Sequence, residues 1–196
     1  FAAAIGNSDN ILSLAAKLGY TGGIQYGYAN LGREFILTLR TTGVAVSGTV
    51  TSFLSAADEV TIRLTEMGET APIFTTTVTG GTQNGNKFTA AYSFDAVPDG
   101  VYTMTVSKKN HVTREYAVTV NGTAVQQDVK VHLTGDVNGD GRINTSDVGK
   151  ANMHAKNKKL LTEYEFACGD VNGDGRINTS DVGKINMHAK DKKLLW

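Results

Sequence analysis

A tandem repeat near the C-terminus constrains the fold of this chain more than any other feature. Residues 135–161 recur as residues 169–195, and each copy contains the string DVNGDGRINTSD. This string places oxygen-bearing side chains at positions 1, 3, 5, 9 and 12 and glycine at position 6, which is the pattern of a twelve-residue calcium-binding loop. The two copies differ only at Ala151/Ile185 and Asn157/Asp191.

The repeated string predicts two bound Ca²⁺ ions, one in each loop. Ca²⁺ takes six to eight oxygen ligands, and Arg at position 7 offers its backbone carbonyl while position 12 closes the shell. Asx-rich turns without metal are the alternative, but a complete ligand set in both copies disfavours it. Three carboxylates per loop repel one another without a cation, so we expect loose order in the calcium-free state. The predicted ligands are Asp136, Asn138, Asp140, Arg142, Asn144 and Asp147, and Asp170, Asn172, Asp174, Arg176, Asn178 and Asp181.

The segments around the loops differ from those of an ordinary EF-hand. Residues 129–133 alternate like a strand, so the entering helix is missing. After each loop, Thr145 and Ser146, or their equivalents Thr179 and Ser180, are suited to cap a helix. Each unit is therefore predicted to be one loop and one exiting helix, with residues 162–168 joining the two units.

This duplicated half EF-hand, over about residues 134–196, resembles the dockerin module of cellulosome-type assemblies. Asp at position 12, where EF-hands usually carry Glu, is typical of dockerins. The resemblance implies two loop–helix units related by pseudo-twofold symmetry, which bind a cohesin module of a scaffoldin or cell-surface anchor. It also implies cohesin contacts at Thr145, Ser146, Asn152, Met153, Lys156 and Asn157, and at Thr179, Ser180, Asn186, Met187, Lys190 and Asp191.

Helical periodicity indicates a similar face. Val148, Ala151 and Ala155 form a narrow apolar stripe that should pack inward, which turns Met153 outward. An exposed methionine, repeated as Met187, suits contact with a partner, although both methionines in the core is the alternative. Because the two faces are almost the same, we expect two docking orientations related by a twofold rotation. Asn-Met stands where some dockerin types carry Lys-Arg, so the cohesin class stays open.

Upstream, residues 44–133 are rich in Thr, Val and Gly and contain seven short alternating runs. This pattern predicts a β-sandwich. The segments VSGTVTSF and PDGVYTMTVSKKNHVTREYAVTV resemble the immunoglobulin-like X modules that precede some dockerins. Turns are predicted at Asn84-Gly85, Pro98-Asp99-Gly100 and Asn121-Gly122, the last as a tight hairpin. Almost no linker separates the β region from the first loop, so we expect the two modules to pack as one unit.

The predicted fold is therefore multidomain α and β, with an immunoglobulin-like β-sandwich X module followed by an all-α dockerin. The expected domains are an unassigned N-terminal segment at 1–43, the X module at 44–133 and the dockerin at 134–196. In the first segment, Ser8 or Asp9 can cap a helix over 11–18, and residues 34–40 suit a strand.

The four histidines and the single cysteine are predicted to have no metal-binding or catalytic role. His154 and His188 lack a second ligand nearby and are expected at a surface or edge, while His111 and His132 lie in strand-like runs. Cys168, the only cysteine, is expected to be a small buried apolar residue.

Composition excludes several classes of function. Nineteen basic and nineteen acidic residues argue against a nucleic-acid footprint, and no apolar run approaches membrane length. No catalytic residue set stands out, so we expect a non-catalytic fragment of a protein that carries, for example, a glycoside hydrolase. A start at Phe1 also indicates a fragment or processed product. Constitutive calcium sites suit an extracellular protein, secreted or attached to the cell surface.

Three functional hypotheses follow. The first is a calcium-dependent docking module that attaches an extracellular polysaccharide-acting protein to a multienzyme complex through a cohesin. The second is a calcium sensor that opens a groove for a helix, which the missing entering helices disfavour. The third is a carbohydrate-binding or hydrolase-associated β domain with a structural calcium module.

Overall fold

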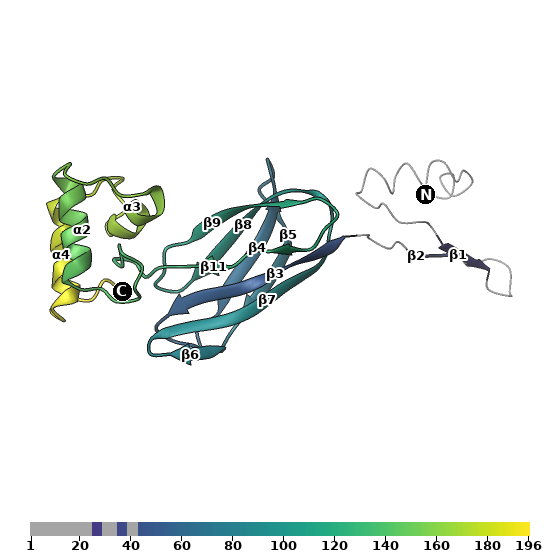
Figure 1. Cartoon of the computed structure of the whole chain (residues 1–196), viewed down its shortest axis with the longest axis horizontal. Coiled ribbons are helices and arrows are strands. Elements are labelled where there is room, and N and C mark those ends of the chain that lie inside the picture. The colour runs from purple at the N-terminus through teal and green to yellow at the C-terminus, as the bar shows by residue number, and fades with distance from the viewer. Residues whose placement is uncertain (1–24, 29–34, 39–42) are drawn as a thin grey trace.

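The structure is a computed structural model that describes residues 25–28, 35–38 and 43–196. Within these residues, a region of β-strands precedes three helices (Figure 1). The predicted strand over 34–40 is present as β2 (Phe35–Thr38), which pairs antiparallel with β1 (Gln25–Tyr28). The helix predicted over 11–18 lies outside the described residues.

The strands from β3 onwards form two sheets, as the alternating runs predict. In the second sheet every pairing is antiparallel, whereas in the first sheet β10 and β11 run parallel to β3. The first sheet has the order β10-β3-β7-β6, with β11 also on β3, and the second has the order β5-β4-β8-β9. The strands of the first sheet are β3 (Val44–Phe53), β6 (Thr82–Asn84), β7 (Lys87–Val97), β10 (Val125–Gln126) and β11 (Val129–Lys130). Those of the second are β4 (Val60–Glu66), β5 (Pro72–Val78), β8 (Gly100–Lys108) and β9 (Arg114–Val120).

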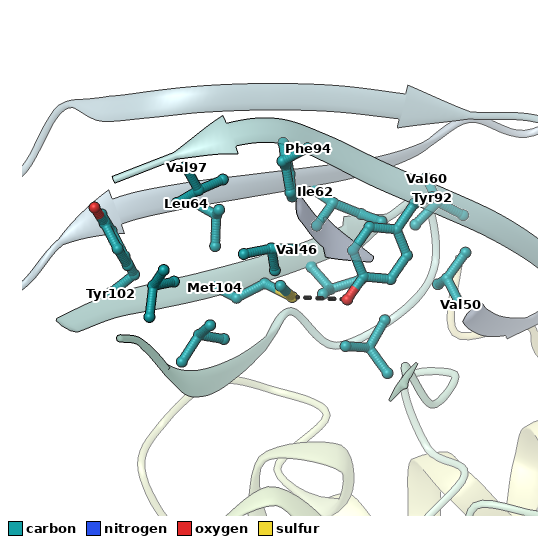
Figure 2. Packing of buried hydrophobic residues seen from close by; sticks show 14 of the residues in the cluster. Val46, Val50, Val60, Ile62, Leu64, Tyr92, Phe94, Val97, Tyr102 and Met104 are labelled. Atoms are coloured by element: carbon teal, nitrogen blue, oxygen red, sulfur yellow. Dashed lines mark hydrogen bonds between the residues drawn. The ribbon is translucent and has the colours of Figure 1, made fainter. Parts of the chain in front are cut away.

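One apolar core fills the space between the two sheets (Figure 2). Alternate residues of the longer strands point into it because successive side chains leave a strand on opposite faces. The Tyr92 hydroxyl lies 3.3 Å from Met104 Sδ and donates to the backbone carbonyl of Gln127, so the one polar group of this large side chain is satisfied. The most deeply buried members are Val46, Val50, Ile62, Leu64, Val97, Met104, Val106 and Val131.

The hairpin predicted at Asn121-Gly122 is wrong. β9 pairs with β8, whereas β10, which follows the turn, pairs with β3 in the other sheet. The turn is therefore a crossover between sheets, held where Gly122 N–H donates to Asp99 Oδ1 at 2.6 Å. A two-residue hairpin would keep both strands in one sheet and leave the partly buried Val125 outside the core that it packs against.

The C-terminal region contains three helices, α2 (Thr145–Ala155), α3 (Glu163–Gly169) and α4 (Thr179–Ala189). None of the helices in the described residues is long and apolar enough to cross a membrane. α2 and α4 are the exiting helices that the repeat predicts, and they pack together through Ala151 and Ile185, both fully buried. The predicted caps are wrong by one position, because Asn144 and Asn178 are the N-caps and the threonines begin the helices.

α3 occupies the segment that was predicted only to connect the two loop–helix units. Thr162 is its N-cap and accepts from Glu165 N–H, while the Glu165 side chain accepts from Thr162 N–H. This capping box is a sequence signal for a helix start, and the Thr-x-x-Glu spacing was sufficient to predict it.

Candidate calcium and docking site

Both repeat loops fold back onto their first aspartate. Asp136 Oδ1 accepts from Gly139 N–H at 2.7 Å and Asp140 N–H at 3.1 Å, and its Oδ2 accepts from Gly141 N–H at 2.8 Å. Asp170 makes the same three bonds in the second loop, at 2.9, 3.2 and 2.8 Å. Gly141 has a φ of 85°, a left-handed conformation that explains glycine at position 6. Identical sequences therefore give nearly identical backbones.

The side chains at positions 3 and 5 interlock in each loop. Asn138 Nδ2 donates to Asp140 Oδ2 at 3.1 Å, and Asp140 N–H donates back to Asn138 Oδ1 at 2.8 Å. Asn172 and Asp174 repeat this pair at 3.0 and 2.9 Å. At position 7, Arg142 N–H donates to Asp140 Oδ1 at 2.9 Å while its side chain stays exposed. The predicted ligands at positions 3 and 5 thus lie side by side in the loop.

Position 9 has a second role. Asn144 Oδ1 accepts from Ser146 N–H at 2.7 Å, and Asn178 Oδ1 accepts from Ser180 N–H at the same distance. These bonds cap α2 and α4. Because an amide oxygen has a second lone pair, capping leaves it able to meet a water on a metal.

Position 12 differs between the two loops. Asp147 Oδ1 accepts from Asn138 N–H and Oδ2 from Asn144 N–H, both at 3.0 Å. Asp181 is also fully buried, and its Oδ2 accepts from Asn178 N–H at 3.1 Å, but its Oδ1 has no hydrogen-bond partner. A buried carboxylate oxygen without a donor is costly, and a cation removes that cost.

The second loop also gathers its carboxylates. Asp170, Asp174 and Asp181 each offer a carboxylate oxygen, and these oxygens lie within 4.8 Å of one another. Together with the unpartnered oxygen at position 12, this oxygen-only set fits a hard cation such as Ca²⁺.

The first loop rests on the β-sandwich. A methyl group added at Gly139 would lie 2.3 Å from His132 Cε1, and one added at Gly141 would lie 2.2 Å from Phe53 Cδ1. Lys130 Nζ donates to the Gly139 carbonyl, and Asn86 Nδ2 donates to the Gly141 carbonyl. This environment buries the first aspartate of the loop, and burial raises the pKa of Asp136 to about 6.

α3 makes a second contact with the β-sandwich. The Tyr164 hydroxyl accepts from His132 N–H at 3.0 Å and donates to the Val112 carbonyl at 2.7 Å. The Arg114 guanidinium lies 4.4 Å from the centre of the Tyr164 ring, a cation–π contact. The predicted direct packing of the two regions is confirmed.

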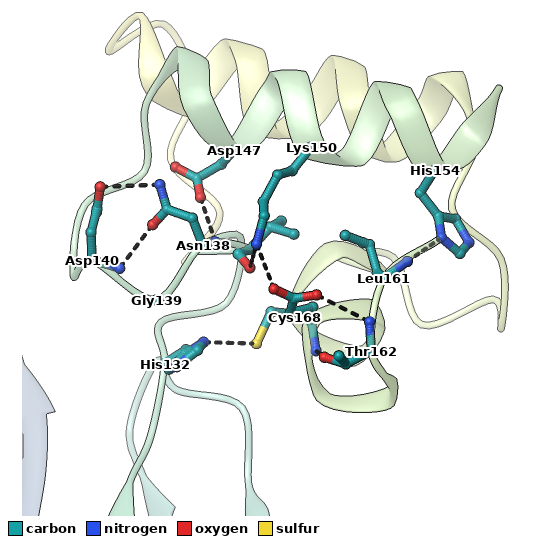
Figure 3. Close-up of polar contacts among 12 residues, drawn as sticks. His132, Asn138, Gly139, Asp140, Asp147, Lys150, His154, Leu161, Thr162 and Cys168 are labelled. Atoms are coloured by element: carbon teal, nitrogen blue, oxygen red, sulfur yellow. Dashed lines mark hydrogen bonds and ion pairs between the residues drawn. The ribbon is translucent and has the colours of Figure 1, made fainter. Parts of the chain in front are cut away.

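Polar contacts also tie α3 to the first repeat (Figure 3). Lys150 of α2 forms an ion pair with Glu165 of α3. The same close-up shows Cys168, which is buried as predicted, with its Sγ 3.8 Å from His132 Nδ1. His132 is thus more than the plain sheet residue that was expected, because its ring lies between the first loop and α3.

The positions proposed to meet a partner lie at the surface of α2 and α4. The side chains of Met153 and Met187 are 42% and 41% exposed, so the alternative that both belong to the core is wrong. Asn152 and Asn186 are half-buried. The other eight positions, Thr145, Ser146, Lys156, Asn157, Thr179, Ser180, Lys190 and Asp191, are exposed.

His154 and His188, near the ends of α2 and α4, each accept a hydrogen bond from the segment that follows the helix. His154 Nδ1 accepts from Leu161 N–H at 3.1 Å, and its ring packs against Phe166 at 5.3 Å between centres. His188 Nδ1 accepts from Leu195 N–H, also at 3.1 Å, and its ring lies 4.8 Å from that of Trp196. These contacts give both half-buried histidines a structural role that was not predicted, since they were expected only at a surface or edge.

Comparison with known proteins identifies the C-terminal region. Residues 134–188 match the dockerin type I domain family, which confirms the predicted dockerin. No curated protein matches the chain. Two crystal structures of a type II cohesin–X-dockerin complex from Acetivibrio cellulolyticus, a C-terminal and an N-terminal interface mutant, are similar at 20% identity and a TM-score of 0.35. Each alignment covers 73% of this chain and 93% of the other. That TM-score is too low to transfer fold or complex, so an X module stays a prediction for the β-sandwich.

Proposed function

We propose that this chain, with its dockerin type I region, is a calcium-dependent docking module that binds a cohesin of a scaffoldin or cell-surface anchor. The observation that carries the proposal is the family match over residues 134–188, which contains both loops and nearly all of both exiting helices. The module would attach an extracellular polysaccharide-acting protein to a multienzyme complex and would itself be non-catalytic.

Calcium would hold the docking helices in place. We propose one Ca²⁺ in each loop, bound by the residues at positions 1, 3, 5, 7, 9 and 12. Support comes from the unpartnered buried oxygen of Asp181 and from the oxygen-only composition of both loops. Each loop ends where a helix begins, since Asn144 and Asn178 belong both to the loops and to the helix caps. Removal of calcium would therefore disturb the helices that carry the partner face.

The proposed cohesin-binding face comprises the exposed and half-buried positions of α2 and α4 named above. Support comes from Met153 and Met187, since a large apolar side chain left about two-fifths exposed is suited to an interface core. The exposed and half-buried residues around each methionine are the same in both repeats apart from Asn157 and Asp191, because the other difference, Ala151 and Ile185, is buried. A partner would accordingly meet nearly the same surface in two orientations.

Calorimetry with a panel of cohesins, with calcium and with EDTA, tests the docking proposal. We expect binding to at least one cohesin in calcium and no binding in EDTA. Binding that persists in EDTA, or no binding to any cohesin, would overturn it.

Paired variants test the two orientations. Asn152→Ala with Met153→Ala, or Asn186→Ala with Met187→Ala, should each leave most of the affinity, whereas all four substitutions together should abolish binding. If either single-face variant loses as much affinity as the combined variant, the partner uses one orientation only.

A carbohydrate-binding function for the β-sandwich receives less support. A cavity beside Lys108, lined also by Asp58 and Phe88, has a volume of about 10 Å³. That is room for about one water molecule rather than a sugar. An extracellular location is proposed because abundant extracellular calcium would keep constitutive sites of this kind filled.

A further inference from the structure

The two calcium loops consist of the same twelve residues but have different surroundings. Residues 136–147 lie against the β-sandwich, whereas in residues 170–181 a methyl group added at Gly173 or Gly175 would meet nothing within 4 Å. Because the two loops have the same sequence, any difference in their calcium affinity or order comes from the residues that each loop contacts.

The first loop is held by contacts that involve no metal. The Phe53 ring fills the space that a side chain at Gly141 would need, and the His132 ring fills the corresponding space at Gly139. Lys130 and Asn86 each donate to a loop carbonyl. Both oxygens of its position-12 carboxylate accept a backbone N–H. The first loop is thus packed and hydrogen-bonded through contacts with the chain itself.

The second loop instead has a buried carboxylate oxygen that accepts no hydrogen bond. Asp181 Oδ1 is buried without a donor, and the bond that Asn138 N–H makes to Asp147 in the first loop has no counterpart to Asp181 in the second. Asp170, Asp174 and Asp181 bring their carboxylate oxygens together. Within the described residues this is the one group of three or more acidic, His or Cys side chains whose ligand atoms converge in this way. Converging negative charges without a counter-ion destabilise the loop, and a divalent cation reverses that effect.

The charge of Lys130 also weakens calcium binding at the first loop relative to the second. The Lys130 ammonium sits on the first loop, where it offsets the loop carboxylates in the metal-free state and repels an incoming Ca²⁺. Preorganisation of the first loop opposes this effect. However, both Asp147 oxygens already accept an N–H group, so an ion there relieves no unpartnered buried oxygen, as it would at Asp181. Interactions that stabilise only the metal-free state weaken metal binding by the same free energy.

We propose that the two identical loops are unequal calcium sites. The loop at 170–181 binds Ca²⁺ more tightly and needs the ion for its order, whereas the loop at 136–147 binds more weakly and is kept ordered by Phe53, Lys130 and His132 of the β-sandwich. This inference concerns the metal and the chain alone, and it holds or fails whether or not the partner is a cohesin.

Calorimetry with Ca²⁺ on the EDTA-stripped chain tests the affinities, using matched substitutions at position 12. Asp147→Ala should leave the tighter step in place, whereas Asp181→Ala should leave a single step weaker by about tenfold or more. Lys130→Met should strengthen the weaker step by several-fold and leave the tighter one unchanged. Equal constants in the two aspartate variants, or loss of the tighter step in Asp147→Ala, would overturn the proposal.

Hydrogen exchange in EDTA tests the order of each loop without relying on binding, so it decides even if an aspartate variant fails to fold. Peptides that include unique flanking residues, such as 130–147 and 164–181, separate the two copies. Amides of the first loop should exchange at least about tenfold more slowly than those of the second. Phe53→Ala should remove that difference while the strands of the sandwich stay protected. Equal exchange of both loops in the unaltered chain would refute the assignment.

Discussion

Gly141 and Gly175 hold the same position in two identical loops, and alanine at each gives a matched test of the contact between loop and sandwich. Both glycines have a left-handed backbone, with φ of 85° and 78°. Alanine should therefore introduce a similar backbone strain at either site. The two sites differ in what the new methyl group meets, which is the Phe53 ring at Gly141 and open space at Gly175.

The expected magnitudes follow from these two terms. Left-handed strain costs about 1–2 kcal/mol for a residue with a Cβ, and it applies to both variants. At Gly141 the methyl carbon would also lie 2.2 Å from Phe53 Cδ1 and 2.3 Å from Cε1. Phe53 is only 2% exposed, so its ring cannot swing into solvent. Overpacking of this kind costs about 1–3 kcal/mol. Gly141→Ala should thus lose about 1–3 kcal/mol more than Gly175→Ala.

Urea denaturation followed by circular dichroism, in saturating calcium, measures both losses. Phe53→Ala gives room for the methyl group, so Gly141→Ala in that background should recover most of the extra cost. An equal loss in the two glycine variants, or no recovery in the Phe53→Ala background, would mean that the first loop does not pack on Phe53 in solution.

Three further predictions concern the sandwich and α3. Burial lowers the pKa of His111 from 6.5 to about 4, so the unfolded chain binds its proton first. The free energy of unfolding is therefore unaffected by His111 above pH 6.5 and falls by up to about 3 kcal/mol as the pH is lowered towards 4. Urea midpoints at pH 7 and 4.5 should show this loss, and His111→Gln should reduce it. Lys108→Met should cost about 2–3 kcal/mol in thermal unfolding because it leaves one hydroxyl and two carbonyls without their donor, whereas the exposed Lys109→Met should be near neutral. Thr162→Ala should cost about 1 kcal/mol by loss of the α3 cap, while Thr145→Ala, just inside α2, should cost less; a larger effect at Thr145 would contradict the assigned caps.

The sequence predicted those parts of the site that depend on local spacing. The side chains of one loop converge through residues at most eleven positions apart, so the string DVNGDGRINTSD is enough to place Asp136, Asn138 and Asp140 around one point. Alternation likewise identified the strands of the sandwich apart from the short, exposed β6, because it reports which face each residue presents. α3 was missed although its Thr162–Glu165 capping box was present in the sequence.

Contacts between distant segments were beyond the sequence. Phe53 and Asn86 lie far from the first loop along the chain, and strand pairing within the first sheet brings them beside it together with Lys130. Nothing in their own surroundings in the sequence marks them as different from other strand and turn residues. The same reason explains the wrong hairpin at Asn121-Gly122, where pairing across the sandwich overrides a favourable local turn.

The two repeats differ at only two positions, and the structure accounts for both differences. Ala151 and Ile185 differ where both are fully buried between α2 and α4, and Asn157 and Asp191 differ where both adopt a left-handed backbone that Asn and Asp tolerate. Packing thus explains why the buried residues differ between the two helices. It does not explain why both helices carry methionine at the same exposed position. That identity is what a partner meeting either face would require.

Equal faces on unequal loops have a consequence for docking. α2 begins at the end of the first loop, which contacts the β-sandwich. α4 begins at the end of the second loop, where a buried Asp181 oxygen accepts no hydrogen bond. As calcium falls, the tighter second site empties last, but only the second helix depends on the ion for its start. Full calcium would then offer two docking orientations. Complete chelation would disorder the start of α4, and because α4 packs on α2 through Ile185 and Ala151, it would also disturb the face on α2.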